Sequence, residues 1–117
     1  NQIVSSIIQT EGNPNYNIDG GLDTVDCIFV LSRSEAERLF SGNDARACIA
    51  TNHAIANGAK INQNNNHYWW FLRTPGYRGE NAAYVGTSGA IYPDGTEVTD
   101  AHNAIRPALR VYLTTQP

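Results

Sequence analysis

The sequence predicts an α+β domain in which two short helices precede a small twisted antiparallel sheet with long irregular loops. Three observations lead to this fold class. The segment His67–Gly76 gathers both tryptophans, a tyrosine and a phenylalanine and then stops at Pro-Gly. A second apolar segment, Ala104–Leu113, lies near the end of the chain, and two helix-capping patterns lie between residues 32 and 58. We expect residues 1–117 to form a single domain.

The first part of the chain predicts little regular structure. Residues 3–9 are rich in Ile and Ser without a clear period, so they could form a strand or the end of a helix. Residues 10–24 are dominated by Gly, Asn, Pro and Asp, which is typical of a long irregular loop. The run Cys27–Leu31 is continuously apolar and of strand length, and this predicts a strand buried on both faces.

Two capping patterns predict the helices. Ser32 or Ser34 is placed to cap a helix over Glu35–Phe40, whose first turn is acidic and therefore suits the helix dipole. Thr51 is placed to cap a second helix over Asn52–Asn57, which a glycine ends.

The aromatic segment is expected to be the central strand, because so many rings cannot lie in water. Trp69 and Trp70 are adjacent, so they would face opposite sides of the strand, both within the core. Arg73 follows on the same strand, and Arg106 lies in the second apolar segment. A guanidinium in such a setting must be paired or stacked, with an aspartate, a loop carbonyl or an indole face as partner. We interpret both arginines as clamps that hold loops to the sheet, and binding of an anionic ligand is the alternative.

Short strands and tight turns are expected after the aromatic segment. Residues 82–85 and 90–92 resemble strands, with a turn at Thr87–Gly89 between them. The sequence Pro93–Gly95 is typical of a hairpin turn, residues 97–99 would pair next, and residues 100–103 would lead into the final strand.

Composition excludes some classes of function. A net charge of −3 and a pI near 5.5 leave no basic face for nucleic acid. No apolar run of about 18 residues predicts membrane insertion. Charged residues are only 16% of the chain and Asn is abundant, which is common in secreted domains and points to an extracellular or cell-surface location. We interpret Cys27 and Cys48 as small buried thiols, with a disulfide as the alternative.

The chain lacks the motifs of common catalytic and metal sites, such as GxSxG, a glycine-rich phosphate loop, HExxH and EF-hand spacing. Its three histidines are far apart and lack ligand spacing. Asp94, Glu97 and Asp100 recur at every third position, and such carboxylates can hold Ca²⁺. Residues three apart on a strand face opposite sides, however. We therefore expect no cofactor, with a structural calcium as the alternative.

Polar and aromatic residues cluster in the loops that follow the aromatic strand. Tyr combined with Asn, Ser and Gly suits an adaptable recognition surface, because Tyr offers contact area at low entropy cost. Ordinary turn chemistry is the alternative. The predicted ligand-contacting residues are Tyr77, Arg78, Glu80, Asn81, Tyr84, Tyr92, Asp94, Glu97, His102 and Asn103.

Several segments, in order, carry a family resemblance. They are Thr24–Ser32, Asp44–Cys48, Trp69–Gly76, Asn81–Val85 and Ile105–Leu109. Together they resemble the bacterial domain of unknown function 6273 family, whose members carry motifs of the form WWLRSPG and VRPAL. Here Phe71 is inserted after the tryptophan pair and Thr74 stands where Ser is usual. Usual members continue further upstream, so the chain resembles the C-terminal part of a longer one.

That family is similar to the C-type-lectin-like fold in the version shared with formylglycine-generating enzymes, which also serves as the variable domain of diversity-generating retroelements. The resemblance implies that the loops between Gly76 and Asn103 form a binding face. It also implies that four residues are scaffold: Trp69, Trp70, Arg73 and Arg106. The Glu-Pro-Asn and Trp-Asn-Asp motifs of calcium-dependent lectins are absent, and the paired cysteines of the formylglycine-generating site have no counterpart.

We therefore expect a non-catalytic ligand-binding module of a bacterium or its resident phage, which recognises a protein or glycan in adhesion or surface recognition. One alternative is an enzyme related to formylglycine-generating proteins, which requires Cys27 or Cys48 to be a reactive thiol. The other is a purely structural domain of a larger surface protein.

Overall fold

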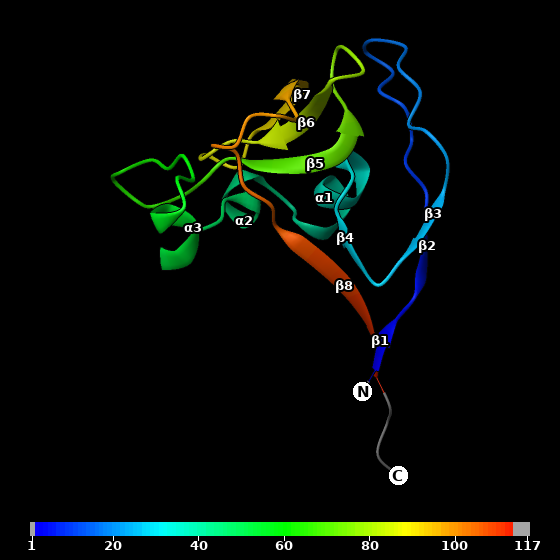
Figure 1. The fold of residues 1–117 in the computed structure, drawn as a ribbon, viewed down its shortest axis with the longest axis horizontal. Coiled ribbons are helices and arrows are strands. Elements are labelled where there is room, and N and C mark those ends of the chain that lie inside the picture. Colours follow the sequence, from blue (N-terminus) through cyan, green and yellow to red (C-terminus); the bar gives the residue numbers. More distant parts are fainter. Residues whose placement is uncertain (1, 114–117) are drawn as a thin grey trace.

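The computed structural model describes residues 2–113, which form a small α+β domain of three short helices and antiparallel sheets (Figure 1). The helices are α1 (Arg33–Leu39), α2 (Asn43–Arg46) and α3 (Asn52–Ala56). The strands before them are β1 (Gln2–Val4), β2 (Ser6–Ile8), β3 (Thr24–Asp26) and β4 (Ile28–Val30). The strands after them are β5 (Trp70–Pro75), β6 (Asn81–Val85), β7 (Ile91–Glu97) and β8 (Pro107–Tyr112).

The strands β5, β6 and β7 form an antiparallel sheet in that order, so the middle strand is β6. The prediction of a central aromatic strand is therefore wrong for this sheet. The second edge of β5 is nevertheless covered, because Phe71 N donates to Ala104 O (3.1 Å) and Arg73 N donates to Leu31 O (2.8 Å). Segments from both halves of the chain thus hydrogen-bond to the edge that the sheet leaves open.

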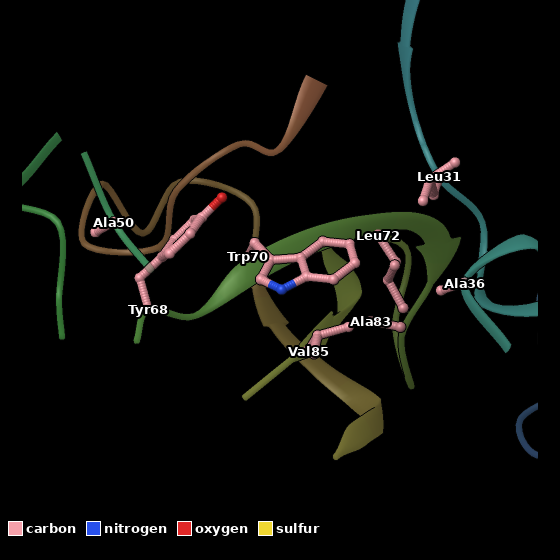
Figure 2. Close-up of a cluster of buried hydrophobic side chains, with 8 residues drawn as sticks. All are labelled: Leu31, Ala36, Ala50, Tyr68, Trp70, Leu72, Ala83 and Val85. Carbon is pink, nitrogen blue, oxygen red and sulfur yellow. The ribbon is translucent and has the colours of Figure 1, made fainter. Parts of the chain in front are cut away.

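The hydrophobic core forms on one face of this sheet (Figure 2). Trp70 is fully buried and pairs with Val85 across the β5–β6 ladder. Trp69 is only partly buried, and Lys60 Nζ lies 5.0 Å from the centre of its ring. The prediction that both indoles lie in the core is therefore right for Trp70 alone. The buried cluster consists of Leu31, Ala36, Ala50, Tyr68, Trp70, Leu72, Ala83 and Val85.

The two predicted helices are confirmed, with Ser32 as the first cap. Ser32 Oγ accepts a hydrogen bond from Glu35 N (3.2 Å), and Glu35 Oε1 accepts one from Ser32 N (2.9 Å), which is a complete capping box. Thr51 Oγ1 accepts from Ala54 N (3.1 Å) at the start of α3. The sequence did not predict α2, because a helix of four residues is too short to show an apolar period.

The predicted hairpin turn at Pro93–Gly95 is wrong, because these residues lie within β7. The register pairs Ala82 with Thr96 and Tyr84 with Tyr92, so three residues of β7 oppose one residue of β6. This is a β-bulge. A bulge can contain Pro93, which has no N–H to donate to the neighbouring strand. Gly95, in the same bulge, has a φ of 77°. The chain therefore continues along one strand where the turn residues predicted a reversal.

The strand β8 joins the remaining strands at one end of the molecule (Figure 1). Residues 107–109 of β8 pair with β4 and residues 110–112 pair with β1, while β2 pairs with β3. Residues 3–9 are thus mostly strand. We call β1, β2 and β3 the N-terminal arm. The Cα radius of gyration is 15.0 Å, compared with about 13 Å for a compact domain of this length, and the extended arm accounts for the difference.

The prediction that Cys27–Leu31 is buried on both faces is wrong. The strand begins at Ile28, which is largely exposed, because no element of the described chain covers that face of β4. Leu31, at the end of the run, is buried in the core, and Phe29 is only partly buried and packs against it.

Candidate functional site

The loop between β5 and β6 presents three of the predicted ligand-contacting residues. The guanidinium carbon of Arg78 lies 4.6 Å from the centre of the Tyr77 ring, and Arg78 Nη1 lies 3.4 Å from Glu80 Oε1. All three side chains are exposed. Exposed pairs of this kind contribute little to stability, so these side chains can exchange their mutual contacts for contacts with a ligand.

Tyr84 and Tyr92 form a stacked pair on the sheet face opposite the core. Their ring centres are 4.9 Å apart with an interplanar angle of 12°, because the two residues are cross-strand partners. Gly86 makes room for this pair, since a Cβ there would lie 2.6 Å from Tyr92 Cε2. Partial burial raises the pKa of Tyr84, and the neighbouring Tyr92 and Asp94 add to this effect. The phenol is therefore neutral at physiological pH.

Asp94 ties the irregular loop of residues 10–20 to β7. Tyr16 Oη donates to Asp94 Oδ1 at 2.6 Å, and this hydrogen bond raises the pKa of Tyr16. Asn13 is buried, and its Nδ2 donates to Pro75 O (3.0 Å) and Pro93 O (2.9 Å). The sequence did not predict these two roles, because the partners lie 62 to 80 residues away. The Asn-Pro pair was the available signal, since Asn13 Oδ1 accepts from Asn15 N in a local turn.

A polar groove of about 490 Å³ lies where the β5–β6 loop meets the end of β7. The side chain of Asn81 is only 5% exposed, and its Oδ1 has no hydrogen-bond partner within residues 2–113. Asn81 therefore forms the floor of the groove and not its rim. The groove is lined by Tyr77, Arg78, Asn81, Gly95, Thr96, Glu97, Thr99 and Asp100.

An apolar cleft of about 500 Å³ adjoins the groove. Asp100 lines both hollows, so they form a continuous surface that we call the loop face. Asn103 Nδ2 is buried at the cleft and has no hydrogen-bond partner in the described part of the chain. Of the predicted ligand-contacting residues, Asn103 lines the cleft. The full lining is Val30, Phe71, Leu72, Arg73, Ala82, Val98, Asp100, Ala101, Asn103 and Ile105.

His102 fixes the carboxylate at the junction of the two hollows. Its backbone N and its Nδ1 lie 3.0 and 3.1 Å from Asp100 Oδ1. The backbone hydrogen bond is the main reason that the pKa of Asp100 is lowered. Asp100 is therefore a fixed negative charge on the loop face.

The structure thus brings most of the predicted residues near one another, but in three settings. Four of them, Tyr77, Arg78, Asn81 and Glu97, line the groove, and Asn103 lines the cleft. Glu80 and His102 contact these hollows through Arg78 and Asp100. The remaining three, Tyr84, Tyr92 and Asp94, lie on the neighbouring strands.

Arg73 donates to four groups of the chain. Nε donates to Thr10 Oγ1 (2.7 Å) and Nη2 to Gln9 O (2.7 Å), while Nη1 donates to Val30 O (2.6 Å) and Glu35 Oε1 (2.7 Å). The acidic partner is thus a glutamate of α1 and not an aspartate. Partial burial alone would raise the pKa of Glu35, but hydrogen bonds from Arg73 and from a backbone N–H outweigh it, so the pKa is lowered.

Arg106 is held by two aromatic rings. Its guanidinium carbon lies 4.7 Å from the centre of the Phe40 ring and 4.9 Å from that of Trp70. Its Nη1 also donates to Arg46 O (3.3 Å). The charge is therefore stacked against the core, between α1 and the sheet.

The cysteines and the acidic residues form no cluster. Cys27 is exposed, so the prediction of two buried thiols is wrong for it, because the chain bends at this residue between β3 and β4. Cys48 is partly buried, and both thiols are free. Among residues 2–113 no three His, Cys, Asp or Glu residues lie together where they could hold a metal ion.

The fold and the loop face define a small α+β domain with polar loops around a buried aromatic strand. Residues 1–113 match the family model described as Domain of unknown function (DUF6273), and the chain belongs to this family. No match was found among the curated proteins or among the solved structures. Within residues 2–113, no helix has both the length and the apolar character needed to cross a membrane.

Proposed function

We propose that this domain is a non-catalytic ligand-binding module of C-type-lectin-like type. In this proposal it recognises a protein or glycan at the cell surface or outside the cell, in adhesion or surface recognition. The observation that supports it is the loop face, where a polar groove and an apolar cleft meet at Asp100. A ligand with both polar and apolar groups can contact both hollows. Asn13 and Tyr16 anchor a neighbouring loop to β7, which reduces the entropy lost on binding.

Arrays of immobilised glycans and surface proteins test this proposal. We expect Tyr77→Ala and Arg78→Ala each to weaken binding about tenfold, because each removes contact area or charge from the loop face. Arg38→Ala is the matched control for Arg78→Ala, since Arg38 is an exposed arginine on α1 that lines neither hollow. Binding that both loop-face variants retain in full would contradict the assignment of this face.

The same proposal extends to a variable protein of a diversity-generating retroelement. In such a protein the loop-face positions would differ between otherwise identical copies. A reverse transcriptase and a template repeat beside the gene would support this, and a gene neighbourhood without them would count against it.

An enzyme related to formylglycine-generating proteins is the second candidate, because the Cys27 thiol is exposed. Its Sγ lies 3.4 Å from Ser5 Oγ. A catalytic thiol is usually activated as a thiolate, which alkylates faster than an ordinary one at neutral pH. Alkylation of Cys27 at the rate of free cysteine would therefore remove this candidate. A purely structural domain, in contrast, would bind nothing on the arrays.

A further inference from the structure

The loop face contains two buried polar atoms that have no hydrogen-bond partner within residues 2–113. One is Asn81 Oδ1, an acceptor that belongs to the floor of the polar groove, and the other is Asn103 Nδ2, a donor at the apolar cleft. Buried polar groups are nearly always hydrogen-bonded in folded proteins. The two atoms therefore indicate a ligand that donates a hydrogen bond in the groove and accepts one in the cleft.

The groove presents further acceptors beside Asn81. Asn81 and Glu97 are cross-strand partners, so their side chains lie on the same face of the sheet as neighbours. Asp100 also lines the groove, and the backbone N–H of His102 donates to its carboxylate (3.0 Å). An amide oxygen and two carboxylates thus face the same hollow.

The basic side chains around this groove are engaged with other groups. Arg78 Nη1 lies 3.4 Å from Glu80 Oε1. Lys60 Nζ lies 5.0 Å from the centre of the Trp69 ring. In the described part of the chain, no lysine or arginine forms an ion pair with either carboxylate of the groove. The groove therefore carries negative charge that complements a cation and repels an anion.

The apolar cleft indicates what carries this cation. Val98 and Ile105 line the cleft and are both 56% exposed, and Asp100 lines both hollows. The aliphatic stem of a lysine or arginine can lie along apolar surface while its charged end reaches a carboxylate. A neighbouring apolar side chain can occupy the cleft, and a peptide carbonyl can accept from Asn103. An amino sugar, in contrast, has no aliphatic stem and no apolar neighbour.

We infer that the loop face binds a segment of a protein ligand in which a basic side chain is next to an apolar one. The basic group pairs with Glu97 and Asp100 and donates to Asn81, while the apolar side chain fills the cleft. This inference rests on the proposed function, and it names a basic protein segment as the ligand where that proposal allows a protein or a glycan.

Titration of the ¹⁵N-labelled chain with short peptides tests the inference, because the side-chain amides of Asn81 and Asn103 give their own NMR signals. The probes are the peptides Gly-Lys-Leu-Gly and Gly-Arg-Leu-Gly with acetylated and amidated ends. We expect both asparagine signals to shift, with a dissociation constant on the order of 1 mM. Comparison of the two peptides shows whether an ammonium or a guanidinium fits better. Norleucine in place of the basic residue keeps the stem without the charge and should weaken binding at least about fivefold.

Glu97→Gln separates the charge of the groove from its shape. It should weaken binding of both basic peptides about fivefold and leave the weaker binding of the norleucine peptide unchanged. Glu97 is exposed, so the variant should fold. Glu37→Gln is the matched control, since Glu37 is an exposed glutamate on α1 that lines neither hollow of the loop face. Equal binding of the lysine and norleucine peptides, or equal weakening by the two variants, overturns the inference.

A third probe separates the failure of this inference from the failure of the proposed function. If glucosamine shifts the Asn81 signal at lower concentration than the basic peptides do, the ligand is a glycan, and the inference is overturned while the proposed function stands. The same holds if ligands from the arrays bind the loop face and no basic peptide does. If neither the arrays nor the peptides show binding, both fail.

Discussion

At the scale of single residues, Arg73 joins more parts of the molecule than any other side chain described above. Its guanidinium connects β5 with residues 9–10, with β4 and with Glu35 of α1. The side chains of Arg73 and Glu35 are only 13% and 15% exposed. Their ion pair is therefore screened less by water than a surface pair. A ligand anion would have to displace these bonds, which favours the clamp interpretation of Arg73.

Arg73→Ala is expected to lower the free energy of unfolding by about 3 kcal/mol, because Glu35 loses its nearest cationic partner and the carbonyls of Gln9 and Val30 lose a donor. Arg73→Lys should cost less, since an ammonium can pair with Glu35 but cannot reproduce the planar fork. Urea unfolding measures both. Arg38→Ala, an exposed arginine, should stay within about 0.5 kcal/mol of the wild type. A loss below about 1 kcal/mol for Arg73→Ala would argue against the clamp.

Glu35 makes the stability depend on pH. Its pKa in the folded chain is lowered from the ordinary value of 4.5, so its contribution is present above that value and is lost as pH falls through the folded pKa. Between about pH 6 and about pH 3, wild type should therefore lose more stability than Glu35→Gln, which keeps an acceptor for the capping box. Glu37→Gln, on the exposed side of α1, is the control and should respond as wild type does. Equal acid responses of Glu35→Gln and wild type would refute this role.

At the scale of the elements, the sequence offered Ser32 and Ser34 as candidate caps of α1, and substitution of each one tells them apart. Ser32→Ala should cost about 1 kcal/mol, because it removes the acceptor for Glu35 N. Ser34→Ala should be nearly neutral, since Ser34 lies inside α1 and, within residues 2–113, its hydroxyl makes only a long hydrogen bond (3.4 Å) with Ser32 Oγ. Chemical denaturation of the two variants gives the comparison. Similar losses for both would mean that the cap is shared.

Local signals in the sequence predicted those elements whose causes are local. The caps at Ser32 and Thr51 were visible because a cap and its N–H donor lie three residues apart. The bulge at Pro93–Gly95 was not visible, because a turn and a bulge use the same residues and only pairing with β6 decides between them. The exposure of Ile28 likewise depends on what covers β4, which its own apolar run does not show.

In the candidate site, too, the sequence predicted only those features whose residues are neighbours along the chain. The groove was predicted in part, because Tyr77, Arg78 and Asn81 are neighbours along one loop. The cleft was not predicted, since its walls come from β4, β5 and the segment before β8. Apolar residues of strands predict burial in general, and no local pattern shows that Phe71 and Ile105 line a shared hollow.

At the scale of the whole molecule, packing is uneven. The sheet of β5, β6 and β7 carries most of the fully buried residues of the core, including Trp70 and Val85. The arm contains the two-stranded ladder of β2 and β3 (Figure 1). The paired residues Ile7 and Val25 of this ladder are both largely exposed, and Ile8 is buried. Elements with few buried apolar contacts open at lower free energy than the core. The molecule should therefore unfold locally at the arm before it unfolds globally.

Native-state hydrogen exchange measures this difference. We expect the amides of the β2–β3 ladder to exchange at least about 100-fold faster than those of the β5–β6 ladder, because opening the arm exposes one buried apolar side chain, Ile8, whereas opening β5–β6 exposes the core. Low denaturant should accelerate exchange in β5–β6 more than in β2–β3, since global unfolding exposes more surface. If both ladders exchange with the same free energy and the same denaturant dependence, the arm and the core form one cooperative unit.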